Sequence, residues 1–224
     1  MSIPTIPEYD FDMTAVTKEG FRRIEGVKQV FVIAFLIYIV VTIFTQSILG
    51  SFFPSSLENP SIINQQIVGI LSYPVLMPLI VGVMMMAVKH TRGESIEVKS
   101  MFEYYHMTGI LSLAGLLVYI MTLLGFVLLI IPGIYLSVAY VFTLPLVADK
   151  GLGAWDAMEL SRKAVNKQWF KIAGVMGMLS IIFLLGILTL GIGLIWAIPL
   201  FFVTLYGLLY PSIFDEVDPK SPLH

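Results

Sequence analysis

Six long apolar segments alternate with short polar stretches along this chain of 224 residues. Each segment holds roughly 15–24 residues, and a helix of about 20 residues crosses the hydrocarbon core of a membrane. The pattern predicts an all-α polytopic membrane bundle with six transmembrane helices at about residues 30–49, 67–88, 107–130, 134–148, 170–188 and 194–213. These spans form one membrane domain, 14–214, between two tails, 1–13 and 215–224.

The polar stretches before the first, third and fifth segments have a helical periodicity of their own. Their apolar residues recur every three to four positions, as on one face of a helix. In the first stretch these residues are Val16, Gly20, Ile24 and Val27. In the second they are Val98, Met101, Phe102 and Tyr105. We therefore expect three amphipathic helices at the membrane surface, the first over residues 14–29 with Asp12 or Thr14 as its cap.

The third polar stretch gives the clearest amphipathic helix. One face collects the larger apolar residues Trp155, Met158, Val165 and Trp169. A stripe of small residues lies beside it: Ala154, Ala157, Ser161 and Ala164. Leu160 and Arg162 each fall on the side that does not suit their type. Because small residues let helices approach closely, the favoured interpretation is a helix that packs under the bundle, with both tryptophans at the interface.

The basic residues give the expected orientation. All 13 lysines and arginines lie before segment one, between two and three, between four and five and just into five, or after six: Lys18, Arg22, Arg23, Lys28, Lys89, Arg92, Lys99, Lys150, Arg162, Lys163, Lys167, Lys171 and Lys220. Cytoplasmic loops of membrane proteins carry such an excess. Both termini and all three amphipathic helices are therefore expected in the cytoplasm.

The chain also suggests three parallel repeat units that start near Thr14, Ser95 and Leu152. Each has an amphipathic helix, a span, an outer connection and a second span. The outer connections of units two and three are predicted to be uncharged turns, Ile131-Pro132-Gly133 and Leu190-Gly191-Ile192-Gly193. The alternative is that any six-span protein with helical inner loops follows this plan without being a repeat.

Composition excludes several classes of protein. Hydrophobic residues make up 58% and charged residues 12%, whereas a soluble domain is about a quarter charged. The net charge of −2 offers no positive field for nucleic acid. Cysteine is absent, which excludes disulfides, thiolate metal sites and cysteine nucleophiles. The spans hold essentially no ionisable residue, which argues against an ion-driven carrier.

Candidate chemistry is sparse. No nucleotide-binding, zinc-protease or hydrolase motif occurs, so we expect no enzyme activity and no cofactor. His90 and Glu94, with Glu103 and His106 nearby, raise a metal site as an alternative. Two histidines in a solvated loop are better explained as interface residues. The run Met84-Met85-Met86 points to different sides of a helix, which favours packing over metal binding.

The region from about residue 123 to 175 resembles a known family. The residues that carry the resemblance are the turn Ile131-Pro132-Gly133, Pro145 before Asp149, a glycine-containing break, Trp155, Ser161 and Trp169. They are similar to a family of bacterial six-span integral membrane proteins of unassigned function, related to the membrane domain attached to some glycerophosphodiester phosphodiesterases. The resemblance implies six spans in the bacterial cytoplasmic (inner) membrane and a connection to lipids or envelope stress. It does not imply hydrolysis, because no phosphodiesterase domain is recognisable.

The leading hypothesis is a non-enzymatic membrane protein that interacts with membrane lipids, or with a membrane or cytoplasmic protein, in envelope maintenance. The candidate contact residues lie on or beside the third amphipathic helix: Trp155, Arg162, Lys163, Lys167, Trp169 and Lys171. Lysines near an anionic membrane surface contribute about 1 kcal/mol each. The alternatives are a transporter or channel for an apolar or neutral small solute and an intramembrane enzyme. A polar cavity at mid-membrane would favour transport.

Overall fold

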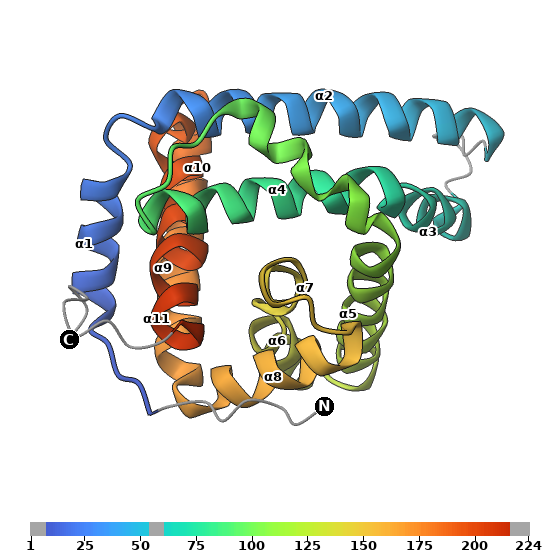
Figure 1. Ribbon diagram of the computed structural model, residues 1–224. Coiled ribbons are helices and arrows are strands. Elements are labelled where there is room, and N and C mark those ends of the chain that lie inside the picture. Colours follow the sequence, from blue (N-terminus) through green and yellow to red (C-terminus); the bar gives the residue numbers. More distant parts are fainter. Residues whose placement is uncertain (1–7, 54–60, 216–224) are drawn as a thin grey trace.

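The computed structural model describes residues 8–53 and 61–215, which form helices joined by short connections (Figure 1). The helices are α1 (Met13–Arg23), α2 (Lys28–Phe52), α3 (Ile62–Leu71), α4 (Tyr73–Thr91), η1 (Val98–Met107), α5 (Thr108–Leu128), α6 (Ile130–Ala139), α7 (Thr143–Lys150), α8 (Ala154–Lys167), α9 (Trp169–Leu188), α10 (Leu194–Phe202), η2 (Val203–Leu209) and α11 (Tyr210–Phe214). The predicted all-α bundle is confirmed. The predictions for residues 1–7 and 216–224 of the tails, and for 54–60 of the first outer loop, lie outside the described residues.

Six stretches of helix are long and apolar enough to cross a membrane. They are Lys28–Phe52, Tyr73–Thr91, Val98–Leu128, Ile130–Lys150, Trp169–Leu188 and Leu194–Phe214. The protein is therefore a multi-pass membrane protein. Large apolar side chains remain exposed along α2, α5 and α9, which suits helices that face lipid rather than water.

Two connections differ from the predicted pattern. The segment expected at 67–88 is divided at Ser72, where α3 ends and α4 begins. Pro74 lies in the first turn of α4, the one part of a helix where the missing N–H of proline is harmless. The turn expected at 131–133 lies at Leu129, whose backbone is extended, and Pro132 falls in the first turn of α6.

Helix α1 follows its predicted pattern. The Asp12 carboxylate accepts hydrogen bonds from the backbone N–H groups of Thr14 and Ala15, at 2.7 and 3.0 Å, and so caps the helix. Val16 and Gly20 are buried on the predicted face. The helix ends earlier than expected because Gly26 has a φ of +85°, which turns the chain before α2.

The spans form three units with one common order. Unit one contains α1, α2, α3 and α4; unit two contains η1, α5, α6 and α7; unit three contains α8, α9, α10, η2 and α11. In an apolar stretch of 18 residues in the first span of units one, two and three, 6%, 22% and 22% of the residues are buried. In the second spans the shares are 61%, 50% and 72%. The second spans therefore build the core, and the first spans surround it.

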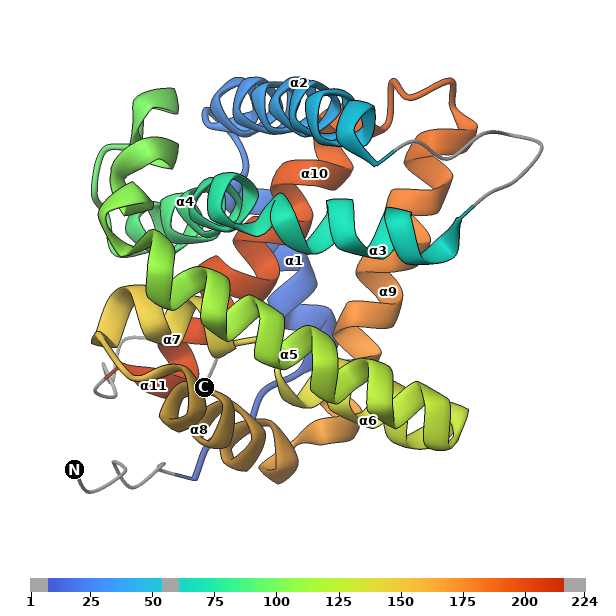
Figure 2. The same cartoon turned by 90° about the vertical axis from the view of Figure 1, so that its right-hand side faces the viewer.

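Each unit packs against the unit before it. Helices η1 and α5 of unit two contact α4 of unit one, and α8 and α9 of unit three contact α6 of unit two. The ring closes because α1 and α2 of unit one contact η2 and α10 of unit three. In Figure 2, α3 and the turns at the far ends of the other two hairpins lie toward the right, whereas η1, α7, α8 and α11 lie toward the left.

Two contacts in this ring require glycine. A Cβ atom on Gly82 of α4 would lie 2.0 Å from the backbone oxygen of Met101 in η1. A Cβ atom on Gly20 of α1 would lie 2.1 Å from Oγ1 of Thr204 in η2. The missing side chains let α4 touch the backbone of η1 and let α1 accommodate the Thr204 side chain, a close approach that is common between membrane helices.

The turns of units two and three are built alike. Gly125 near the end of α5 faces Gly133 in α6, and Gly186 near the end of α9 faces Gly193 before α10. A Cβ atom on Gly125 would lie 3.0 Å from Cα of Gly133, and one on Gly186 would lie 3.1 Å from the carbonyl carbon of Gly193. Each pair lets the two arms of a hairpin meet directly after a tight turn.

The predicted face of the second amphipathic helix is wrong in part. Element η1 is a 3₁₀-helix, which has three residues per turn rather than 3.6. The apolar residues of η1 that pack on the core are therefore spaced by three: Val98, Met101, Tyr104 and Met107. Phe102 and Tyr105, which were expected on that face, are exposed and stack on each other with their ring centroids 6.3 Å apart.

Gly82→Ala is expected to destabilise the bundle by about 2–3 kcal/mol, because the added methyl group meets backbone that cannot move aside. The matched control is Gly69→Ala in α3, where a Cβ atom meets nothing within 4 Å. That variant should be neutral, or stabilised by up to about 1 kcal/mol through helix propensity. Thermal unfolding of the detergent-purified protein measures both, and equal midpoints for the two variants would contradict the contact.

Candidate functional site

Helix α8, which carries most of the predicted site, packs through its small residues. Ala157, Ser161 and Ala164 are buried. Ser161 Oγ lies at the break between α6 and α7, where it accepts a hydrogen bond from the N–H of Phe142 (3.2 Å) and donates one to the carbonyl of Ala139 (2.8 Å). Buried backbone groups in a membrane must find such partners. Ser161 therefore stabilises the kink of the fourth span.

The opposite face of α8 is turned outward. Trp155 was expected to pack with Met158 and Val165, but its side chain is 61% exposed, whereas Met158 and Val165 are buried. Leu160, which the helical wheel placed on the wrong side, is also buried. The small-residue stripe decides this orientation, because a helix approaches its neighbours most closely through small side chains.

The exposed face of α8 carries an aromatic and two basic side chains, together with the acidic Asp156. Lys163 and Lys167 are exposed, and Phe170, in the first turn of α9, is 85% exposed. Together with Trp155 they form a surface that we call the aromatic–basic face. Rings and lysines of this kind are typical of the level of lipid headgroups in a membrane.

Two of the predicted cations share one carboxylate. Arg162 donates two hydrogen bonds to Glu159, at 2.9 and 2.8 Å, and Lys163 Nζ lies 3.3 Å from the same group. The hydrogen bond from Arg162 is the main reason why the pKa of Glu159 is lowered. The Glu159 carboxylate therefore neutralises one of the two positive charges, and the three side chains together keep a net charge of +1.

Trp169, unlike Trp155, packs against a neighbouring helix. Its ring stacks on Tyr135 of α6 with the centroids 6.2 Å apart, and its Nε1–H donates to the Tyr135 carbonyl at 3.4 Å. The Tyr135 hydroxyl in turn donates to Asn166 at 2.8 Å. Trp169 therefore fastens the start of α9 to α6, and only Trp155 of the two candidate tryptophans is largely exposed.

The end of the expected N-terminal tail is packed rather than free. Tyr9 and Phe11 are buried, whereas Asp10 between them is exposed. An extended chain places alternate side chains on opposite sides in this way. The Tyr9 hydroxyl donates to the Ala164 carbonyl at 2.7 Å, and the Gln168 amide donates to the Tyr9 carbonyl at 3.3 Å. We call residues 8–12 the strap; the alternation of aromatic and acidic residues is the sequence signal that could have revealed it.

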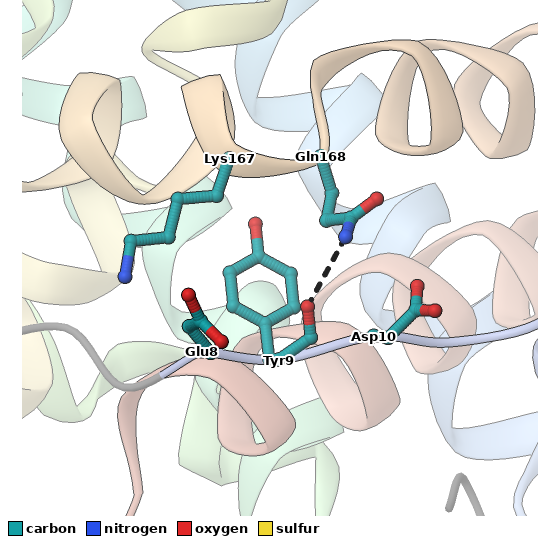
Figure 3. A pocket seen from close by; sticks show the side chains of 5 residues that line it. All are labelled: Glu8, Tyr9, Asp10, Lys167 and Gln168. Atoms are coloured by element: carbon teal, nitrogen blue, oxygen red, sulfur yellow. Dashed lines mark hydrogen bonds between the residues drawn. The ribbon is translucent and has the colours of Figure 1, made fainter.

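A pocket of about 510 Å³ lies where the strap crosses the junction of α8 and α9 (Figure 3). Its lining residues are Glu8, Tyr9, Asp10, Lys167 and Gln168. Beside it, Lys171 forms an ion pair with Asp10, and the hydrogen bond from Lys171 lowers the pKa of Asp10. Lys171 Nζ also lies 6.0 Å from the centroid of the Phe11 ring. Lys167 lines the pocket on the opposite side of the Tyr9 ring from Asp10, the residue that Lys171 binds.

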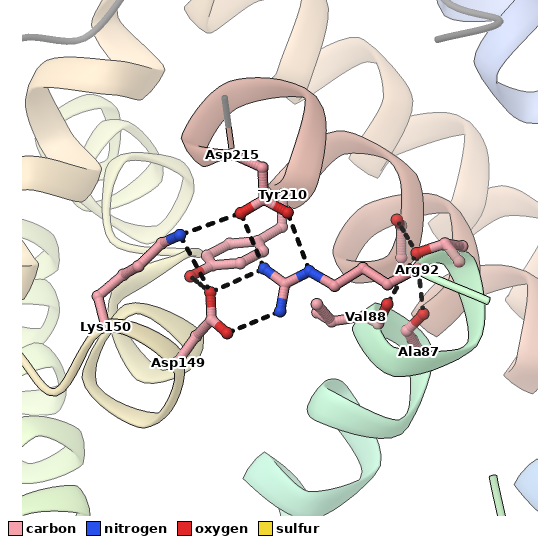
Figure 4. Close-up of polar contacts among 9 residues, drawn as sticks. Ala87, Val88, Arg92, Asp149, Lys150, Tyr210 and Asp215 are labelled. Atoms are coloured by element: carbon pink, nitrogen blue, oxygen red, sulfur yellow. Dashed lines mark hydrogen bonds and ion pairs between the residues drawn. The ribbon is translucent and has the colours of Figure 1, made fainter. Parts of the chain in front are cut away.

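A second polar site joins the ends of the three second spans (Figure 4). Arg92, directly after α4, donates to Asp149 of α7 at 2.8 and 2.9 Å and to Asp215, after α11, at 2.9 and 2.8 Å. Lys150 donates to Asp215 at 3.0 Å, and the Tyr210 hydroxyl donates to Asp149 at 2.9 Å. We call these five residues the ionic cluster. Its carboxylates, Asp149 above all, raise the pKa of Arg92, so the cluster joins all three units by charged hydrogen bonds.

Sequence reasoning missed the ionic cluster, although a signal for it was present. Asp149 and Asp215 each follow a proline, Pro145 or Pro211, by four residues. The same spacing at the end of two second spans marks equivalent positions in units two and three. Arg92 in unit one lacks this spacing, and only the packing of the three units brings it between the two carboxylates.

The histidines that raised the metal alternative each bind backbone. His90 Nε2 lies 2.8 Å from the Arg23 carbonyl, and His106 Nδ1 lies 2.7 Å from the Glu103 carbonyl. Within residues 8–53 and 61–215, no group of three or more histidine, aspartate and glutamate side chains is placed to hold a metal ion. His90 instead ties the end of α4 to the end of α1.

Ser161→Ala is expected to lower the free energy of unfolding by about 1–3 kcal/mol, because it leaves two buried backbone groups without a partner. The control is Ser180→Ala. The exposed Ser180 hydroxyl donates a hydrogen bond to the Met176 carbonyl in its own helix. The readout is the thermal unfolding midpoint in detergent. A Ser161 variant as stable as the Ser180 variant would show that the kink does not depend on this hydroxyl.

Arg92→Gln should destabilise the protein by about 1–3 kcal/mol, because two half-buried carboxylates lose their common partner. Lys99→Gln removes the same charge from an exposed pair with Glu97 and should cost less than about 1 kcal/mol. Chemical unfolding of both variants, followed by circular dichroism, compares the two losses. An equal effect would mean that the ionic cluster adds no more than a surface ion pair.

No protein-family model, curated protein or solved structure matches this chain. The resemblance around residues 123–175 therefore stays a prediction. The structure nevertheless gives its residues physical roles. Asp149 belongs to the ionic cluster, Ser161 holds the kink of the fourth span, and Trp169 fastens α9 to α6.

Proposed function

We propose that this protein is a non-enzymatic, multi-pass protein of the bacterial cytoplasmic membrane that binds anionic lipids through the aromatic–basic face of α8, in the maintenance of the envelope. Both termini lie in the cytoplasm in this proposal. The support for this orientation is the distribution of lysine and arginine, which avoids every second connection between spans. The elements η1, α7, α8 and α11 also lie toward a common side in Figure 2, which supports this orientation.

The observation that carries the proposal is the division of α8 into two faces. Its small residues pack into the bundle, while Trp155, Lys163 and Lys167 point outward. Phe170 extends the exposed apolar surface at the start of α9. A helix with an exposed ring at one end and lysines at the other suits the level of lipid headgroups, where each lysine contributes about 1 kcal/mol.

The packing of the second spans favours lipid binding over transport. Leu79 of α4 and Val203 and Leu209 of η2 are fully buried. A Cβ atom on Gly207 would lie 2.9 Å from the carbonyl of Ala87, so α4 and η2 are in direct backbone contact. Close packing of α4 against η2 offers no support for a route between them that a solute could follow.

The test is the amount of anionic lipid that the protein retains through purification in detergent. The double variant Lys163→Gln/Lys167→Gln should retain severalfold less, since each lysine accounts for up to about fivefold in affinity. Native mass spectrometry measures the bound phosphatidylglycerol and cardiolipin. The control Lys18→Gln/Lys99→Gln removes the same charge from exposed positions outside α8 and should retain as much as the unaltered protein.

Two results would contradict the proposal. Unchanged retention by the α8 variant would mean that this face binds no anionic lipid. A protein partner would then be the remaining candidate for this face. Equal losses in both double variants would mean that total charge, and not the aromatic–basic face, governs retention.

A further inference from the structure

The turns that close units two and three are exposed and apolar. We call residues 126–131 and 187–192 the tips of these units. The Ile131 side chain at the first tip is 79% exposed. The tips continue the exposed apolar surface of α5 and α9, which suits contact with lipid. One apolar surface thus extends from each of these helices over the turn that follows it.

Unit one ends differently from the other two units. Residues 107–148 and 172–214, which contain the tips, include no charged residue, histidine, asparagine or glutamine. The connection of unit one carries Glu58, and Ser51 before it and Gln65 after it are exposed. A turn at the membrane surface meets water and headgroups, where polar side chains are favoured. The end of unit one suits those surroundings, and the two tips do not.

The tip of unit three binds its polar atoms within the chain. The Thr189 hydroxyl accepts a hydrogen bond from the N–H of Gly193 at 3.0 Å and donates one to the Gly186 carbonyl at 2.9 Å. The N–H of Gly191 donates to the Ile187 carbonyl at 3.2 Å. In hydrocarbon no water is present to bind these groups, so the chain must supply their partners.

The tip of unit two follows the same rule. The N–H of Leu129 donates to the Gly125 carbonyl at 3.0 Å, and the N–H of Gly133 donates to the Leu129 carbonyl at 3.3 Å. Pro132, in the first turn of α6, has no N–H that needs a partner. Both turns therefore supply from within the chain partners that water would otherwise provide.

Leu190 occupies an unusual position for a leucine. Its backbone is left-handed, with a φ of +55°, and its side chain is 95% exposed. Glycine or asparagine is the usual residue in such a conformation. A large apolar side chain at the most exposed point of a turn is unfavourable in water and favourable in hydrocarbon. The choice of leucine here points to lipid around the tip.

The helices that lead to the tips are short for a tilted crossing. Helix α5 has 21 residues and α9 has 20, so they measure about 31 and 30 Å, against about 30 Å of hydrocarbon. Helix α2 runs across Figure 1 and is seen close to end-on in Figure 2, whereas α5 runs obliquely across Figure 2 and α9 runs upward in both views. The three helices thus point in different directions, and a membrane normal between them leaves each one tilted. Helix α2, with 25 residues or about 37 Å, can still cross, but α5 and α9 fall short of the far headgroups.

We propose that the tips of units two and three end within the hydrocarbon of the outer leaflet, where they contact the acyl chains of phospholipids, and that unit one is the hairpin that reaches the water beyond. The partner of this surface is the apolar part of the lipid. The proposal therefore goes beyond the headgroup contact of α8 and does not depend on it.

The test uses the absence of cysteine from the chain, which lets a single introduced cysteine carry a nitroxide spin label. The full-length variants Leu190→Cys and Ile131→Cys are reconstituted in vesicles of phosphatidylethanolamine and phosphatidylglycerol. Power saturation then compares the collisions of each label with oxygen, which concentrates in hydrocarbon, and with a water-soluble nickel chelate. Ser51→Cys is the reference for water, and Leu184→Cys, at an exposed position of α9, is the reference for hydrocarbon. Labels at both tips should match the Leu184 label, with an oxygen-to-nickel ratio severalfold above that of the Ser51 label.

The nickel chelate is present during reconstitution, so both sides of the vesicle contain it and the direction of insertion does not matter. A tip label with the same ratio as the Ser51 label would place that turn in water and overturn the proposal. Low access to both reagents, with an immobilised spectrum, would mean that protein rather than lipid covers the tip, which also overturns it. The exposed positions Val127 and Ile192 replace a tip position whose variant does not fold.

Discussion

The bundle depends on close contacts between helices that only small residues permit. In a membrane, apolar side chains gain little from leaving lipid, so helices associate through close packing and hydrogen bonds. Gly82 lets η1 rest on α4, and Gly20 lets α1 rest on η2. Ser161 combines small size with a hydroxyl that serves the broken backbone of the fourth span. The same constraint turns the small stripe of α8 inward and Trp155 outward.

Close packing also explains why the three units form a ring. Each amphipathic element covers a helix of the second span in the preceding unit, so no unit is complete by itself. The ends of the second spans then meet in the ionic cluster, where Arg92 of unit one lies between Asp149 of unit two and Asp215 of unit three. The ring and the cluster hold α8 and its exposed side chains in a fixed position.

The candidate contact residues separate into structural and exposed groups once the fold is known. Trp169 and Arg162 are bound to neighbours within the chain, Tyr135 and Glu159. Trp155 and Lys163 are exposed on the outer face of α8. Lys171 lies between these groups, since it forms an ion pair with Asp10, whose side chain is exposed. The proposed lipid contact therefore involves the exposed side chains of the outer face of α8.

Apolar length and the positions of the basic residues were sufficient to predict six spans and their common plan, because both properties are local to each segment. Packing decided the rest. The 3₁₀ register of η1 moved Phe102 out of the core, and the small stripe turned Trp155 outward. Arg92 meets carboxylates 57 and 123 residues away. Such pairs leave no periodic trace in a sequence, because they exist only when distant helices are brought to one end of the bundle.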